Sequence, residues 1–107
     1  MRPVFTSTPV GGGNSPPVPL DQYLNPFNVS LEVDINGAAT YTVEWTQSDI
    51  WNTDPATWIW QPGPANLVNA VTSQTGTLIS PVAAVRCRQT AGAGNANFTV
   101  RQSGAAT

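Results

Sequence analysis

The stretch that decides the fold is SLEVDINGAATYTVEWT, residues Ser30–Thr46. Apolar and polar residues alternate on both sides of Asn36-Gly37, which is the pattern of two half-buried strands. Asn-Gly between two such runs is a strong signal for a β-hairpin. A three-residue loop keeps apolar residues opposite apolar ones, so the predicted register places Leu31 opposite Tyr41.

The rest of the chain from residue 28 onward is predicted to consist of short strands separated by turns. The segment 57–60 is a candidate strand between two proline-containing turns. The alternating runs 82–89 and 96–102 are joined by the glycine-rich 91–95, which predicts a second hairpin. Many short strands and no convincing helical stretch predict an all-β protein, a small antiparallel β-sandwich or a barrel-like domain.

Residues 1–27 differ in composition and are predicted to form an extended N-terminal arm before a β-sandwich domain at 28–107. They hold six of the ten prolines and three consecutive glycines, which exclude a helix or an inner strand. We expect such a segment to be held by something, either a neighbouring subunit or its own domain. The first alternative makes the following arm residues partner-binding: Pro3, Val4, Phe5, Pro9, Val10, Pro16, Pro17, Pro19, Leu20 and Tyr23.

Composition excludes several classes of partner. Only 9% of the 107 residues are charged, the net charge is −2, and the chain has four arginines and no lysine. That is too little positive charge for binding to nucleic acid or to an anionic membrane surface. There is no apolar run long enough to span a bilayer and no signal-peptide pattern. A polar, uncharged surface suits contact with other proteins, although a neutral secreted β-domain is the alternative.

The residue inventory argues against an enzyme and predicts no cofactor and no metal. Without histidine, no Ser-His-Asp or Cys-His arrangement can exist. The single cysteine, Cys87, cannot form an internal disulfide and is expected in the core. In the predicted hairpin, Glu32, Asp34 and Glu44 share the polar face, which could serve a hydrolase or calcium, but a solvated sheet face is the favoured interpretation.

Four tryptophans lie within residues 45–60. Trp45 continues an apolar strand face and is predicted to be part of the core. Trp51, Trp58 and Trp60 are candidates either for a subunit interface or for stacking against a glycan, because an exposed indole ring can do both.

The chain resembles small virion-associated proteins of tailed bacteriophages. The resemblance covers residues 28–104 and rests on VSLEVDINGAATYTVEWTQSDIW, ATWIWQPGPANLVNAVTSQTGTLISPVAAVRCRQT and GNANFTVRQSG. The shared elements are a strand at Thr40–Thr46 followed by Asp49, Thr57-Trp58, Ser80–Arg86, and Gly94–Gly104. These motifs are structural, and no catalytic residues travel with them.

The resemblance implies a structural virion protein that binds the capsid surface as a decoration or cement protein. Its partners would be the major capsid protein or other virion proteins and further copies of itself, for example in a trimer. It would be made in the bacterial host cytoplasm and located in the virion. The alternatives are a head-tail or tail accessory protein, and a carbohydrate-binding module that uses exposed tryptophans.

Overall fold

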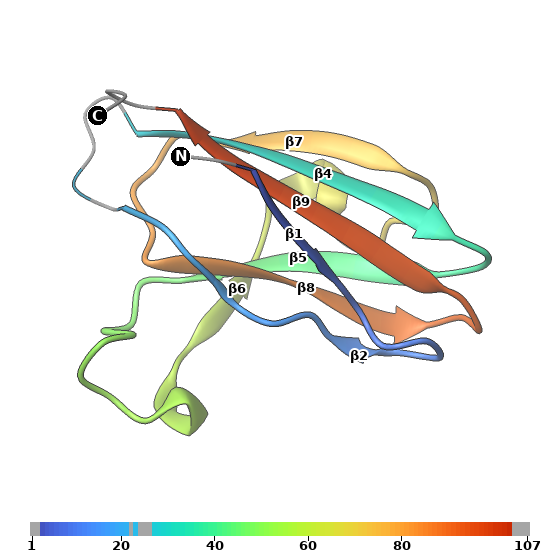
Figure 1. Cartoon of the computed structure of the whole chain (residues 1–107), viewed down its shortest axis with the longest axis horizontal. Helices are drawn as coiled ribbons and strands as arrows, with labels where there is room; N and C mark the ends of the chain where they lie inside the picture. The colour runs from blue at the N-terminus through green and yellow to red at the C-terminus, as the bar shows by residue number, and fades with distance from the viewer. Residues whose placement is uncertain (1–2, 22, 24–26, 104–107) are drawn as a thin grey trace.

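The computed structural model describes residues 3–21, 23 and 27–103, which form two antiparallel sheets packed face to face (Figure 1). One sheet has the order β1-β9-β4-β7; the other has the order β2-β8-β5-β6, and β3 also pairs with β8. The all-β sandwich predicted from the sequence is therefore confirmed. The elements are β1 (Val4–Ser7), β2 (Gly13–Asn14), β3 (Val18–Pro19), β4 (Asn28–Asn36), β5 (Thr40–Thr46), η1 (Pro55–Thr57), β6 (Trp60–Pro62), η2 (Ala65–Leu67), β7 (Gln74–Leu78), β8 (Ala84–Ala91) and β9 (Asn95–Ser103).

The core lies between the sheets and is built from the alternating apolar residues. In β4 every second residue from Val29 to Val33 is buried, while the residues between them are exposed. Tyr41, Phe98 and Leu31 are the largest fully buried side chains. Full burial of an aliphatic or aromatic side chain contributes roughly 1.5–3 kcal/mol. The predicted inward faces of β4, β5 and β9 are thus confirmed.

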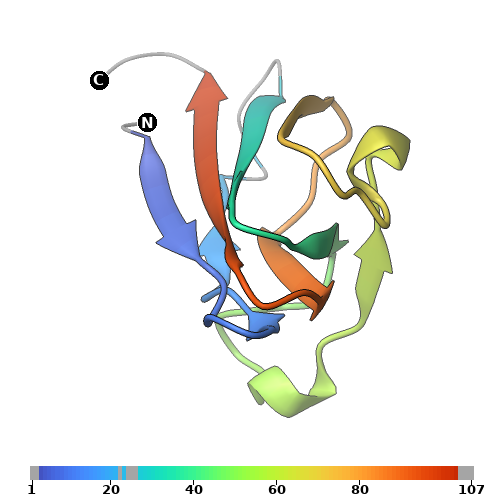
Figure 2. The same cartoon turned by 90° about the vertical axis from the view of Figure 1, so that its right-hand side faces the viewer.

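The first predicted hairpin is wrong, because β4 and β5 belong to different sheets. β4 pairs with β9 and β7, whereas β5 pairs with β8 and β6. Leu31 lies opposite Val100, not opposite Tyr41. The connection at Asn36-Gly37 is an arch that carries the chain across the sandwich (Figure 2). The alternation of apolar and polar residues does not distinguish a hairpin within one sheet from an arch between two sheets, since the same residues are buried in both.

The second predicted hairpin is also an arch, from β8 in one sheet to β9 in the other. The two arches lie side by side, and the Gly94 N–H donates to Ala38 O at 2.8 Å. A Cβ on Gly92 would overlap Ala38 O, and Gly92 also has a φ of +103°. A Cβ on Gly94 would overlap Asn36 O. The glycine-rich sequence therefore permits the close approach of two crossing segments.

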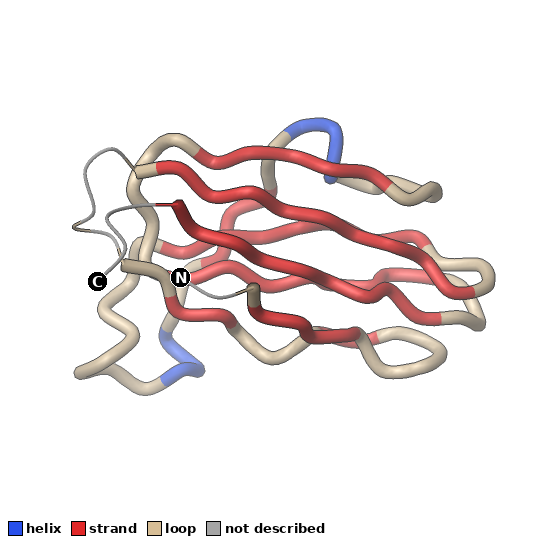
Figure 3. Tube along the Cα trace, turned by 45° about the horizontal axis from the view of Figure 1, so that its top comes forward, coloured by secondary structure: helices blue, strands red, loops and turns tan. Residues whose placement is uncertain are grey.

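The N-terminal segment lies on its own domain, which is the second of the two alternatives stated above. β1 extends one sheet beside β9, and β2 and β3 lie along β8 in the other sheet (Figure 3). Val18 and Leu20 are buried in the core. The Ser15 Oγ accepts the N–H of Cys87 at 2.8 Å. The segment is extended, as predicted, and its prolines and glycines confine it to sheet edges.

Candidate interaction surfaces

The ionisable groups of the core are poorly suited to catalysis. Cys87 is fully buried, and desolvation, with a smaller effect of the Glu44 charge, raises the pKa of its thiol to about 12. Desolvation likewise raises the pKa of Tyr41 to about 12, and its hydroxyl donates to Thr72 O at 2.7 Å. A thiol with so high a pKa is almost entirely protonated at neutral pH and is a weak nucleophile. The location of Cys87 in the core agrees with the prediction.

The carboxylates do not gather into one site. Glu32 and Asp34 lie on the outer face of the β1-β9-β4-β7 sheet, whereas Glu44 lies on the outer face of the other sheet. The expectation that these three share one face is corrected, because it depended on the hairpin. Among residues 3–21, 23 and 27–103, no group of three or more His, Cys, Asp or Glu side chains could hold a metal ion.

Two of the tryptophans form a cluster with an ion pair on the outer face of the β2-β8-β5-β6 sheet. The ring centroids of Trp58 and Trp60 are 6.2 Å apart, and the rings are inclined at 57°. The Arg86 Cζ lies 4.2 Å from the Trp60 ring centroid, and its Nη2 lies 2.9 Å from Glu44 Oε1. Arg88 Nη1 is 3.9 Å from the other oxygen of Glu44. The guanidinium is thus fixed between a carboxylate and an indole.

Within this cluster the indoles are only partly available to a ligand. Trp58 and Trp60 are half-buried, and Arg86 covers part of Trp60. The Trp58 Nε1 donates to Thr53 Oγ1 at 3.1 Å. Sequence reasoning named Glu44 as a candidate but missed its pairing with Arg86, because nothing in the local pattern places β8 beside β5. The cluster is a rigid, mixed aromatic and charged patch.

Trp51 is the most exposed of the candidate tryptophans, at 73%. It lies on a loop that Asp49 stabilises: the carboxylate accepts the N–H groups of Trp51 and Asn52. Hydrogen bonds from the Asn52 side chain and from backbone N–H groups lower the pKa of Asp49. Trp51 lines a shallow depression of about 320 Å³ together with Pro19, Leu20, Asp21 and Tyr23.

An apolar groove follows the side of the sandwich where β6 and β7 lie. It consists of two adjoining depressions of about 500 and 400 Å³ that share Trp45 and Gln47. Ile59 borders the first, and Ile79 borders the second; both are exposed. Trp45 is half-buried and packs against the core, so its predicted role there holds in part. We call this feature the Trp45 groove.

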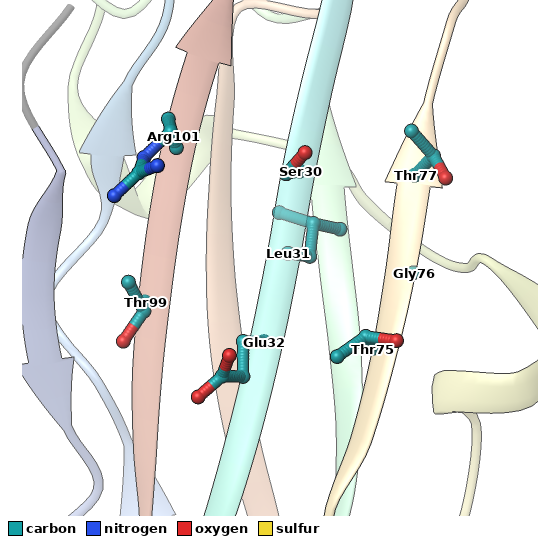
Figure 4. A pocket seen from close by; sticks show the side chains of 8 residues that line it. All are labelled: Ser30, Leu31, Glu32, Thr75, Gly76, Thr77, Thr99 and Arg101. Atoms are coloured by element: carbon teal, nitrogen blue, oxygen red, sulfur yellow. The ribbon is translucent and has the colours of Figure 1, made fainter.

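The outer face of the β1-β9-β4-β7 sheet carries a depression of about 470 Å³, lined mostly by polar residues (Figure 4). Thr75 and Thr77 of β7 lie on one side of it, Ser30 and Glu32 of β4 lie in the middle, and Thr99 and Arg101 of β9 lie on the other side. Glu32 and Arg101 are its only charged lining residues. The face offers hydroxyl groups and little charge. Its lining is Ser30, Leu31, Glu32, Thr75, Gly76, Thr77, Thr99 and Arg101.

The predicted partner-binding residues of the N-terminal segment divide into two groups. Leu20 is buried and Val4 is partly buried against the core, so these two contact their own domain. Phe5, Val10 and Tyr23 are exposed by 75%, 77% and 87%. Pro3 is half-buried, and the remaining prolines of that set, Pro9, Pro16, Pro17 and Pro19, are exposed.

Comparisons with known proteins give a likeness of fold. No protein-family model matches the chain, and no curated protein matches it. Among solved structures, it is similar to a chain described under "Bacillus endospore appendages form a novel family of disulfide-linked pili". The TM-score is 0.50 and the identity is 16%, over 97% of this chain and 87% of that chain. In the described part of the chain, no helix is long and apolar enough to cross a membrane.

Proposed function

We propose that this protein is a non-enzymatic structural subunit that functions by binding other protein subunits. The observation that carries the proposal is the Trp45 groove, where exposed isoleucines border a half-buried tryptophan. Apolar surface of this kind, rimmed by polar residues, is characteristic of protein contacts. The low charge of the chain supports the same view, because few charges have to be desolvated on contact.

The specific form of the proposal is a virion protein that decorates or cements a bacteriophage capsid. It rests on the resemblance of residues 28–104 to small virion-associated proteins. In this proposal the Trp45 groove binds the major capsid protein or another virion protein, and the rigid sandwich adds bulk at the particle surface. A head-tail or tail accessory role uses the same groove with a less abundant partner.

The first test is the copy number of the chain in gradient-purified particles of its source, measured by quantitative mass spectrometry. Hundreds of copies per particle support decoration, whereas about a dozen indicate the neck or tail. Absence from particles refutes the virion role. The groove is tested separately with Ile79→Asp, which should abolish binding to particles without unfolding the exposed site, and with Val10→Asp as a matched exposed control.

A carbohydrate-binding role remains the second candidate, and the exposure of Trp51 beside Tyr23 favours it. Exposed aromatic rings on two loops can stack on the apolar face of a sugar. Titration with host polysaccharide should quench tryptophan fluorescence, and Trp51→Ala should remove the response. If quenching survives that substitution, Trp51 is not the binding site; if no glycan produces quenching, the role is refuted.

A further inference from the structure

The edges of the two sheets differ in how they are protected from pairing with another strand. The outer edge of β7 is capped at Thr75, whose carbonyl accepts a hydrogen bond from Asn66 Nδ2 at 2.6 Å, and the η2 segment that carries Asn66 is held against β7 by the buried Leu67, which lies next to Gly76. β6 is three residues long and ends at Pro62. Short strands, prolines and covering segments are the usual means of blocking an edge.

The opposite edge of the second sheet is blocked in the same way. β2 and β3 are two residues long, and β3 contains Pro19. The chain between them carries Pro16 and Pro17, which have no N–H to donate. Neither strand can therefore act as a template for a longer one.

Apart from its short length of four residues, β1 has no such protection. Its sequence, Val-Phe-Thr-Ser, contains no proline, glycine or charge, and it forms the end of its sheet (Figure 2). The Thr8 N–H donates to Ala96 O at 2.9 Å, so the alternation of an antiparallel ladder directs the N–H groups of residues 4, 6 and 8 toward β9. The N–H and C=O groups of Phe5 and Ser7 consequently point outward.

We propose that the β1 edge binds the β1 edge of a second copy of this chain, antiparallel across a two-fold axis. Within a second copy, the described edges other than β1 are blocked, so β1 is the strand available to it. An isologous contact of this type closes on itself as a dimer. It joins the two four-stranded sheets into one continuous sheet.

The register of this contact follows from the ladder. If Phe5 lies opposite Ser7 of the second copy and Thr6 lies opposite Thr6, every outward N–H and C=O of Phe5 and Ser7 finds a partner. Pairing Phe5 with Phe5 instead places Ser7 opposite Pro3, which has no N–H. A shift by one residue would put outward Phe5 opposite inward Thr6 and is excluded by the pleat.

The Thr6 hydroxyl provides a second, independent observation. Its Oγ1 is buried and has no hydrogen-bond partner among the described residues. A buried polar atom without a partner costs about 1–3 kcal/mol. In the proposed register the two Thr6 side chains form a non-hydrogen-bonded pair, the closer of the two kinds. A rotation of each Thr6 side chain about χ1 would bring its hydroxyl, which its own chain covers here, to the hydroxyl of the second copy.

The contact is independent of the Trp45 groove, which lies on the opposite side of the sandwich beside β6 and β7. A dimer formed through β1 leaves both grooves open. If the protein fails to bind particles, the proposed β1 dimer is not refuted. If the protein is monomeric, the proposed binding role of the Trp45 groove is not refuted.

The test is the mass of the full chain in solution, measured by light scattering and sedimentation over a range of concentrations. A four-residue pairing is small, so we expect a reversible dimer with twice the 11.3 kDa mass of the chain. Ser7→Pro should abolish the dimer, because it removes an outward N–H and leaves the bonds to β9 intact. Ser7→Ala is the matched control and should remain dimeric.

Cysteine substitutions report the register directly. Thr6→Cys should give a covalent dimer under mild oxidation, whereas Phe5→Cys should not, because Phe5 faces Ser7. Native Cys87 is fully buried and does not compete. A chain that remains monomeric up to about 1 mM overturns the proposal. So does an oligomer that Ser7→Pro leaves unchanged, and crosslinking by Phe5→Cys alone overturns the register.

Discussion

Replacing Leu20 with alanine tests whether the N-terminal segment belongs to the core of its own domain. Leu20 is 6% exposed and packs in the same buried cluster as Val18 and Val85. Its N–H donates to Ala83 O at 2.9 Å, which holds the backbone in place when the side chain is shortened. The substitution removes three carbons, worth about 2.4 kcal/mol at roughly 0.8 kcal/mol each. The cavity left behind raises the expected loss of unfolding free energy to about 3 kcal/mol.

The assay is urea and thermal unfolding at two protein concentrations. A loss of about 3 kcal/mol lowers the Tm by roughly 12 °C in a domain of this size. Val10→Ala, in the same segment but 77% exposed, is the control and should change stability by no more than about 0.5 kcal/mol. Equal effects of the two substitutions would refute the reasoning. So would a Leu20→Ala effect that appears only where copies associate, as expected if Leu20 contacted a neighbour.

Three further outcomes follow from buried polar groups. Gln89→Ala removes the acceptor of the Thr8 hydroxyl and the donor to three loop carbonyls, so the free energy of unfolding should fall by about 3 kcal/mol in urea titrations. Burial raises the pKa of Cys87 to about 12 from an ordinary value near 9, so the stability that its protonated thiol contributes is complete below pH 9 and is lost as the pH rises toward 12. Cys87→Ala should make the free energy of unfolding fall less steeply over that range, in which Tyr41, whose pKa is also raised to about 12, still titrates. Glu44→Gln breaks the half-buried pair with Arg86 and should cost about 2 kcal/mol and alter tryptophan emission.

The strands and their inward faces could be predicted from the sequence because alternation is a local property. In β4, the burial of Val29, Leu31 and Val33 follows from a period of two. Which strand lies beside β4 could not be predicted in this way. The Asn36-Gly37 sequence is compatible both with a tight hairpin turn and with an arch between the sheets. In either case Gly37 can adopt a positive φ, which is +81° in this structure. The arch is decided by distant contacts, such as the close approach of Gly92 to Ala38.

The interaction surfaces depended on the same distant contacts. Trp60 was a candidate from its residue type, but its neighbour Arg86 comes from β8, a strand that joins it only through β5. Leu20 and Val18 look like arm residues because prolines surround them, yet the prolines merely restrict the segment to sheet edges. Packing on its own domain and docking on a neighbouring subunit are compatible with the same local sequence. The two cases differ only in whether the segment pairs with a strand of its own chain or with one of a neighbour.

The distribution of edge protection bears on how a chain with so little charge avoids aggregation. Electrostatic repulsion between copies of the chain is weak at a net charge of −2, so unwanted association must be limited by the structure of the sheet edges. Proline and chain length limit pairing at β6 and β3, and Asn66 does so at β7. If β1 were blocked too, residues 3–21, 23 and 27–103 would present no strand edge to a partner. With β1 the one open edge among these residues, pairing is possible once per chain, which produces a closed pair and not a fibre.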